Sequence, residues 1–257
     1  MALPPLVAPS AALTTAEAER YARHLTLPAV GSPGQRRLKS ARVAVVGAGG
    51  LGSAVLLYLA AAGVGTIGVV DRDVVEESNL QRQVLHGTHD VGRSKVASAR
   101  DAIERANPLV YVEVHDLRLD ATSALGTLGG YDLVVDCTDN FATRYLIDDT
   151  CVALGLPLVW GSVSGFDGQV SVFWAAPPPG HGYDGVHLRD VFPDLPTNGG
   201  AGGGVLGVVC GAIGSVMAGE AVKLITGIGE PLLGRMLTFD ALTMRWREIP
   251  VRPGAGP

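Results

Sequence analysis

The segment RVAVVGAGGLG, residues 42–52, decides the fold predicted for this chain of 257 residues. An apolar run ends at Val46 and is followed directly by the pattern G-x-G-x-x-G, which contains Gly47, Gly49, Gly50 and Gly52. Glycines in this pattern permit a tight turn, a close approach of the backbone to phosphates, and close packing of the next helix on the strand. The segment therefore predicts a strand, a phosphate-binding turn and a helix, but it does not say which nucleotide is bound.

An acidic residue ends the next apolar run. Residues 66–70 read TIGVV, and Asp71 follows them, nineteen residues after Gly52. At this spacing, dinucleotide- and adenosine-binding folds place an acid on the ribose hydroxyls. Asp71 could instead cap a neighbouring turn, but the glycine pattern before it favours the ribose role.

Strand-like and helical segments alternate along the first two thirds of the chain. Strands are expected at 42–46, 66–70, 110–114, 132–136 and 158–161. Helices are expected at 15–24 and 94–106; another follows the glycine turn and ends at residue 62, and another follows residues 137–140 and ends at residue 154. This alternation predicts a parallel sheet with right-handed crossovers. Further strands near 170–174, 235–239 and 245–249 surround a helix at 207–226. We therefore expect an α/β, Rossmann-like fold: a mainly parallel sheet flanked by helices, with antiparallel C-terminal strands.

The expected domain organisation is simple. Residues 1–13 are rich in Pro and Ala and are predicted to form a flexible N-terminus, and residues 14–257 a single domain. Within it, residues 174–205 are rich in Gly and Pro and form a long crossover loop, and loops of this length usually cover or bind something.

Composition excludes several classes of protein. The net charge is −5 without any block of Lys or Arg, so no nucleic-acid partner is expected. Residues 43–70 carry no charge, but the glycine turn inside them favours a buried Rossmann unit over a membrane span. The N-terminus has no basic region typical of a secretory signal, and three scattered cysteines form no C-x-x-C pair. We expect a cytoplasmic protein.

A second motif indicates what happens to the phosphates. Residues 78–83 read SNLQRQ, and Lys95 and Asp139 follow downstream. Arg82 supplies a fork of N–H donors and Lys95 a point charge, and both suit phosphate groups. The alternative is that they are solvated surface charges. Asp139 and its neighbour Asn140 could likewise serve only to cap the following helix.

Together these motifs resemble the MoeB/ThiF/HesA group, the bacterial relatives of ubiquitin-activating enzymes. The resemblance rests on RYARH (20–24), the glycine turn, Asp71-x-Asp73, SNLQRQ, VGRSKV (91–96), CTDN (137–140) and GxxGQV (165–170), and it covers nearly the whole chain.

The resemblance implies an activity and a set of roles. Members of the group use ATP and Mg²⁺ to adenylate the C-terminal glycine carboxylate of a ubiquitin-like, β-grasp sulfur-carrier protein that ends in Gly-Gly. It implies that Arg82, Lys95 and Asp139 are catalytic, with Asp139 organising the metal. Asn79 and Gln83 would add polar contacts. Arg23 resembles an arginine finger supplied across a homodimer interface.

The sequence departs from the group in two places. Many members hold a structural zinc with two C-x-x-C pairs, but here His187 and Asp190 stand in the first pair and the second is missing, so no structural zinc is expected. Members often carry a loop cysteine that takes the activated acyl group, but the region around Gly200 has none. The chemistry is therefore expected to stop at the acyl-adenylate, with sulfide or a sulfurtransferase acting afterwards.

Three alternatives remain open. The substrate could be the terminal carboxylate or amide of a peptide in natural-product biosynthesis. The chain could be an NAD-dependent oxidoreductase, although it lacks a Tyr-x-x-x-Lys pair. It could also be a non-catalytic binding module. The sequence does not identify the carrier protein or its pathway.

Overall fold

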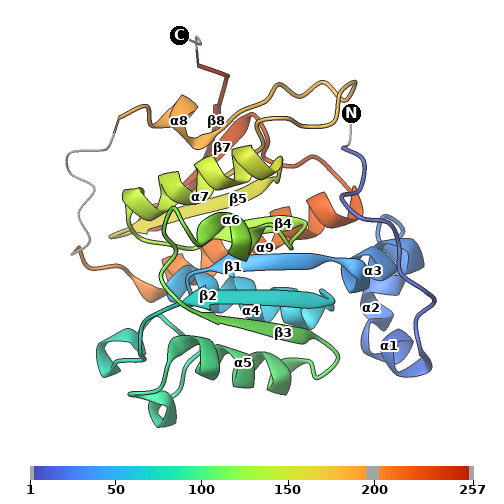
Figure 1. Cartoon of the computed structure of the whole chain (residues 1–257), viewed down its shortest axis with the longest axis horizontal. Helices are drawn as coiled ribbons and strands as arrows, with labels where there is room; N and C mark the ends of the chain where they lie inside the picture. The colour runs from blue at the N-terminus through green and yellow to red at the C-terminus, as the bar shows by residue number, and fades with distance from the viewer. Residues whose placement is uncertain (1–2, 195–202, 255–257) are drawn as a thin grey trace.

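The computed structural model describes residues 3–194 and 203–254. Its centre is an eight-stranded sheet of order β3-β2-β1-β4-β5-β6-β7-β8 (Figure 1). The strands are β1 (Arg42–Val46), β2 (Thr66–Asp71), β3 (Tyr111–Asp116), β4 (Leu133–Asp136), β5 (Leu158–Ser164), β6 (Asp167–Phe173), β7 (Arg235–Asp240) and β8 (Arg245–Pro250).

Strand directions divide the sheet into two parts. β3, β2, β1, β4 and β5 are parallel, and in β1 Val45 pairs with Val69 on one side and Val135 on the other. β6, β7 and β8 are antiparallel. The predicted α/β fold, with a mainly parallel sheet and antiparallel C-terminal strands, is confirmed.

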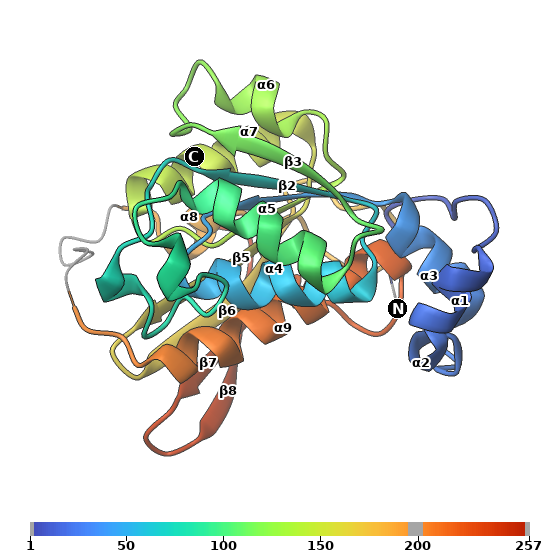
Figure 2. The ribbon, with the colours of Figure 1, turned by 90° about the horizontal axis from the view of Figure 1, so that it is seen from below.

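Helices cover both faces of the sheet. They are α1 (Thr15–Arg20), α2 (Ala22–Leu25), α3 (Gly31–Ser40), α4 (Gly50–Ala62), α5 (Lys95–Ala106), α6 (Ala124–Leu128), α7 (Phe141–Leu154), α8 (Leu188–Val191) and α9 (Gly207–Thr226). Figure 2 shows α4, α5 and α9 on one face of the sheet and α6 and α7 on the other. Because both faces are covered, the central strands are apolar throughout rather than alternating, as in Val43–Val46.

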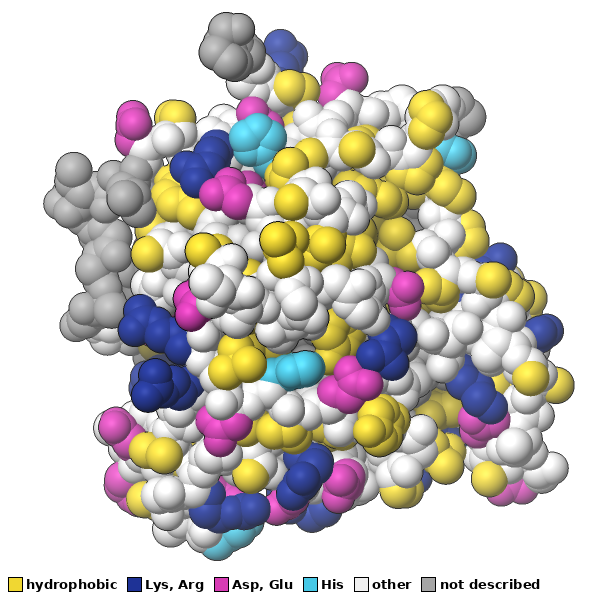
Figure 3. All heavy atoms as spheres, viewed as in Figure 1, with side chains coloured by type: hydrophobic (Ala, Val, Ile, Leu, Met, Phe, Trp, Pro, Cys, Tyr) yellow, Lys and Arg dark blue, Asp and Glu magenta, His cyan; other side chains and the backbone are white. Residues whose placement is uncertain are grey.

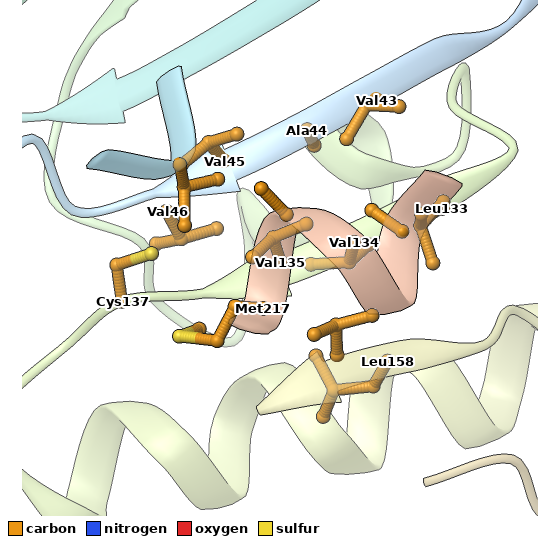
Figure 4. Close-up of a cluster of buried hydrophobic side chains, with 14 of the residues drawn as sticks. Val43, Ala44, Val45, Val46, Leu133, Val134, Val135, Cys137, Leu158 and Met217 are labelled. Atoms are coloured by element: carbon orange, nitrogen blue, oxygen red, sulfur yellow. The ribbon is translucent and has the colours of Figure 1, made fainter. Parts of the chain in front are cut away.

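The core lies between the sheet and these helices. Val45, Val135 and Leu158 are fully buried, and Met217 of α9 closes the cluster (Figure 4). α9 is long and apolar enough to cross a membrane by length and composition, with a mean hydropathy of 1.7. It packs against α4, α3 and strands β5 and β6, so its apolar surface is that of a core helix.

The N-terminal helices differ from the prediction. The helix expected at 15–24 is two short helices that meet at Tyr21, whose ring packs against Gly63 and whose hydroxyl accepts a hydrogen bond from Asn107. The sequence predicted no helix over α3, because glycine and proline usually end helices. Pro33 lies in its first turn, where a missing N–H costs nothing, and buried Leu38 anchors the helix.

Two segments expected to be irregular make specific contacts. At the N-terminus, Leu3 is buried and the N–H of Leu6 donates to the Leu224 carbonyl. The crossover loop contains α8 and is fastened to α7, because the Tyr145 hydroxyl donates to the carbonyls of Phe192 and Asp194. Composition alone gave no sign of these long-range contacts.

Candidate active site

A cavity of about 820 Å³ opens at the carboxyl ends of the parallel strands. Its wall contains the glycine turn after β1, the residues after β2 and β4, and Val163 and Ser164 of β5. Open α/β sheets bind ligands at this edge, where the strand order reverses on either side of β1. The cavity is large enough for a nucleoside triphosphate.

The glycine turn forms the floor of the cavity. Gly47, Gly49 and Gly50 line it, and Gly49 is the N-cap of α4, so the free N–H groups of the first helical turn lie at the cavity. Gly52 lies behind the floor: a Cβ added there would stand 2.0 Å from the Gly47 carbonyl oxygen. Only glycine lets α4 approach β1 this closely.

Asp71 ties the turn to the end of β2. One carboxylate oxygen accepts from the Ala48 N–H at 2.8 Å, and the other accepts from the Asp73 N–H at 2.8 Å. Asp71 also lines the cavity. The turn-capping role weighed for Asp71 is therefore present, and its position remains compatible with a ribose role.

Arg82 and Lys95 both lie in the cavity wall. Lys95 is buried, and its ammonium contacts the exposed Asp73 carboxylate at 2.8 Å, which leaves two of its three N–H donors for a ligand. Arg82 is half-buried and uses one guanidinium nitrogen to donate to the Ser78 carbonyl at 3.1 Å. The remaining N–H groups of its guanidinium are available to an anion.

The other residues of the polar motif differ in position. Gln83 lines the cavity and is buried, and its side-chain oxygen has no hydrogen-bond partner among the described residues. Asn79 lies outside the wall: its side chain caps the short turn Glu77–Asn79, and its carbonyl accepts from the N–H groups of Arg82 and Gln83. Asn79 therefore supports the turn that carries both residues.

Asp139 is the exposed carboxylate on the β4 side of the cavity. Its neighbour Asn140 caps α7, accepting from the Thr143 N–H at 2.9 Å. The capping role considered for the pair thus belongs to Asn140, and Asp139 remains free to meet a ligand. Its side-chain oxygen lies 3.5 Å from the Asn140 amide nitrogen.

The cavity carries the opposite charge to the whole chain. Its wall contains five basic residues (Arg72, Arg82, Lys95, Arg118 and Arg144) and three acidic ones (Asp71, Asp73 and Asp139), a formal charge of 5 − 3 = +2. The complete chain carries −5. On the face of the molecule drawn in Figure 3, Lys and Arg side chains stand at the left as well as at the right and the bottom of the view. A positive cavity in a negative protein favours an anionic ligand.

Arg23 is the one predicted catalytic residue far from this cavity. It lies on α2, and the α1–α3 group packs at the amino ends of the strands, where the Thr66 N–H donates to the Ala41 carbonyl (Figure 1). The glycine turn is at the carboxyl ends. Arg23 therefore does not reach the cavity of its own chain.

A family model described as "ThiF family" matches residues 21–255. The chain belongs to the ThiF family. It is 58% identical over 254 residues to "Probable adenylyltransferase/sulfurtransferase MoeZ" of Mycobacterium tuberculosis, covering 97% of this chain and 64% of that protein. It is 51% identical over 243 residues to "Sulfur carrier protein adenylyltransferase" of Thermus thermophilus, covering 93% of this chain and 89% of that protein.

The fold also matches solved structures. The crystal structure of PaaA superimposes with a TM-score of 0.79 at 26% identity, covering 94% of this chain and 76% of that one. Of the two sequence relatives named above, the chain spans less than two thirds of the length of the MoeZ protein and most of the length of the Thermus protein.

The positions where many ThiF-family members place zinc-binding cysteines hold a hydrogen-bonded cluster instead. Asp190 accepts from the N–H of Gly254 at 2.7 Å and from the N–H of His187 at 2.9 Å. The His187 ring lies 3.8 Å from Asp148. Across residues 3–194 and 203–254, no group of three or more His, Cys, Asp or Glu side chains is arranged to hold a metal ion. The place around Gly200, where many members of the group carry the loop cysteine, lies outside the described residues.

Several wall residues were missed by the sequence reasoning. Arg72 and Arg118 follow the ends of β2 and β3, Arg144 lies one turn into α7, and the Cys210 thiol lies against Gly50. Burial raises the pKa of Cys210. Arg72 could have been suspected from its place beside Asp71. Nothing in the spacing of the others separates them from surface or core residues.

Proposed function

We propose that this protein is an ATP-dependent adenylyltransferase that acts on the C-terminal glycine carboxylate of a ubiquitin-like sulfur-carrier protein. The observation that carries the proposal is the cavity itself. A glycine turn, two phosphate-compatible cations (Arg82 and Lys95) and a free carboxylate (Asp139) line one cavity. The identity to a protein named as a sulfur carrier adenylyltransferase, over most of both chains, supports the same function.

The reaction joins two negatively charged groups. A carboxylate oxygen of the carrier attacks the α-phosphorus of ATP, the bond from that phosphorus to the bridging oxygen breaks, and pyrophosphate leaves. Catalysis then depends on alignment and charge neutralisation. The N–H groups of the glycine turn hold the phosphates, and Arg82 and Lys95 neutralise their charge. Asp71 holds the ribose, and the buried Gln83 amide adds a polar contact.

We propose that Asp139 holds Mg²⁺. When bound, the ion would offset the negative charge of the phosphates. The residues present suit it: Asp139 offers a carboxylate, and the Thr138 hydroxyl oxygen beside it is buried without a hydrogen-bond partner among the described residues. Magnesium is commonly held by one or two carboxylates together with substrate phosphates, so a single protein carboxylate is sufficient.

The carrier tail would enter along the end of the crossover loop. Gly203, Gly204 and Val205 line the cavity beside Val163 and Ser164, because Val205 pairs with Gly165. This end of the loop is fixed, because the Gly165 N–H donates to the Gly204 carbonyl and the Leu206 N–H donates to the Gly165 carbonyl. Gly203 and Gly204 have no side chains, so an extended tail that ends in glycines can pass close to them.

We further propose a homodimer in which Arg23 of each protomer completes the cavity of its partner. The support is its distance from its own cavity, at the opposite edge of the sheet, together with the family resemblance of residues 20–24. After adenylation, sulfide or a separate sulfurtransferase would convert the acyl-adenylate to a thiocarboxylate.

ATP–pyrophosphate exchange tests the proposal. The protein is assayed with Mg²⁺ and a panel of β-grasp carriers ending in Gly-Gly, and each carrier is also tested without its last glycine. Exchange that depends on an intact carrier tail supports the function. ATP binding without exchange, for every carrier, would exclude it and favour a peptide substrate or a non-catalytic binding module. Binding of NAD in preference to ATP would favour the oxidoreductase.

A further inference from the structure

The turn that carries Asp139 is held on both sides of it. Before Asp139, the Thr138 N–H donates to the Asp136 carboxylate at 2.9 Å. The Thr138 carbonyl accepts from two nitrogens of Arg144, Nη2 at 2.8 Å and Nε at 3.2 Å. After Asp139, Asn140 caps α7. Asp139 is thus the exposed residue between two fixed neighbours.

Arg144 is buried deeply for an arginine, with 4% of its surface exposed. Its guanidinium lies over two aromatic rings, 4.9 Å from the centre of Phe141 and 5.5 Å from the centre of Trp160. The fully buried Asp136 and the exposed Asp139 both attract the Arg144 guanidinium electrostatically. Burial of a charged group is costly unless it is compensated, so such an arrangement points to a specific role.

We propose that Arg144 is a positioning residue: it fixes the Thr138 carbonyl so that the Asp139 carboxylate faces the cavity in the orientation that receives the metal. The inference rests on the proposed metal role of Asp139. Arg144 acts through the backbone of the turn, at a place where a displacement of a fraction of an ångström moves a ligand oxygen out of range.

The geometry explains why the residue is arginine. Two donors, Nε and Nη2, converge on one carbonyl, and the planar guanidinium lies over two aromatic rings, which a lysine ammonium on a flexible stem cannot reproduce. The rings are themselves held by their neighbours: Phe192, from the end of α8, packs 5.7 Å from Trp160 and 5.3 Å from Phe141. Arg144 therefore has little freedom to move towards a ligand.

The test separates positioning from direct contact with ATP, since Arg144 also borders the cavity. Arg144→Met and Arg144→Lys are compared with the parent for ATP affinity by calorimetry, with excess chelator and with Mg²⁺. The Mg²⁺ concentration for half-maximal exchange is also measured. We expect metal-free ATP affinity to change less than about twofold, while the Mg²⁺ requirement rises roughly tenfold or more. Arg144→Lys should recover the Mg²⁺ requirement of the parent only in part.

Arg189→Met is the matched control. Like Arg144, Arg189 lies over an aromatic ring, that of Tyr145; it pairs with Asp149 at 2.7 Å, and it is not in the cavity wall. It should leave the Mg²⁺ requirement unchanged. If Arg144→Met does not fold, Trp160→Phe, which alters one ring beneath the guanidinium, takes its place with the same expected direction.

Two results would overturn the inference. One is an unchanged Mg²⁺ requirement in the folded variants, and the other is a large loss of metal-free ATP affinity, which would mean that Arg144 contacts the nucleotide. Asp139→Asn is measured in parallel. If it shifts the Mg²⁺ requirement and Arg144→Met does not, only the positioning role fails. If Asp139→Asn has no effect, the proposed metal role itself is wrong.

Discussion

Cys210 in the first turn of α9 lies directly against Gly50 in the phosphate turn. A Cβ added at Gly50 would stand 2.7 Å from the Cys210 sulfur, and the thiol itself is buried. The helix that follows the crossover loop is therefore packed against the floor of the nucleotide cavity. Any side chain at position 50 has to move the Cys210 side chain, displace α9 or distort the turn.

This contact predicts a rescue. Gly50→Ala should weaken ATP binding by about tenfold, because overpacking at such a site costs on the order of 1–3 kcal/mol. Cys210→Ala alone should bind ATP nearly as the parent does, and the double variant should recover most of the lost affinity. Calorimetric titration with ATP measures all three. Equal affinities for the single Gly50→Ala variant and the double variant would contradict this account of the packing.

Asp139→Ala should leave the fold intact and remove turnover. The side chain is exposed, so its loss should move the melting temperature by only a degree or two, as usual for surface substitutions. Mg²⁺-dependent pyrophosphate exchange should fall by about a hundredfold or more, because even the loss of a residue that supports a metal ligand commonly costs about 10–100-fold in metal affinity or activity. Normal exchange by a folded Asp139→Ala protein would refute the metal role.

The proposed arginine finger predicts complementation between two inactive variants. Arg23→Ala should bind ATP but not turn over, and Asp139→Ala should also be inactive. When the two are unfolded and refolded together, half of the dimers are mixed and each has one complete cavity, so activity should return to about a quarter of the parent value. Each variant refolded alone is the control. If the mixture stays inactive while mixed dimers are present, Arg23 does not act across the interface.

Asp148 predicts a pH-dependent stability. Burial raises its pKa from 3.8 to about 6, so the folded state prefers the protonated form. The contribution of Asp148 to the free energy of unfolding is therefore greatest below about pH 4 and is lost as the pH rises through 6. The free energy of unfolding falls by up to about 3 kcal/mol over this range. Asp148→Asn should remove this part of the pH profile of unfolding by denaturant. Asp149→Asn, an exposed neighbour, should retain it, and identical profiles for all three proteins would show that Asp148 is not responsible.

The sequence predicted those parts of the structure that local patterns specify. The apolar run 42–46, its glycine turn and Asp71 lie where periodicity and spacing place them, because a buried parallel strand and a tight phosphate turn have few alternatives. The wall residues Arg82, Lys95 and Asp139 were identified from motifs in fixed order, and the structure brings all three to one cavity. Their catalytic roles remain predictions.

What the sequence could not predict depends on tertiary contacts. α3 contains residues that usually end helices, and it is held in place by tertiary packing: Leu38 is fully buried in the core, and the helix packs against α9. Arg144 looks like any polar residue of an amphipathic helix until the fold places Thr138, Phe141 and Trp160 around its guanidinium. The packing of Cys210 on Gly50 joins positions 160 residues apart, which no local pattern reveals.

The central claim is that a carboxylate oxygen of the carrier becomes bonded to the α-phosphorus of ATP. The most direct measurement uses a carrier whose C-terminal carboxylate carries heavy oxygen, with hydroxylamine added to trap the acyl group. Hydroxylamine breaks the bond between the acyl carbon and oxygen, so the account predicts AMP with one heavy oxygen, seen by mass spectrometry. AMP formed without the label would mean that water, rather than the carrier carboxylate, attacked the phosphorus.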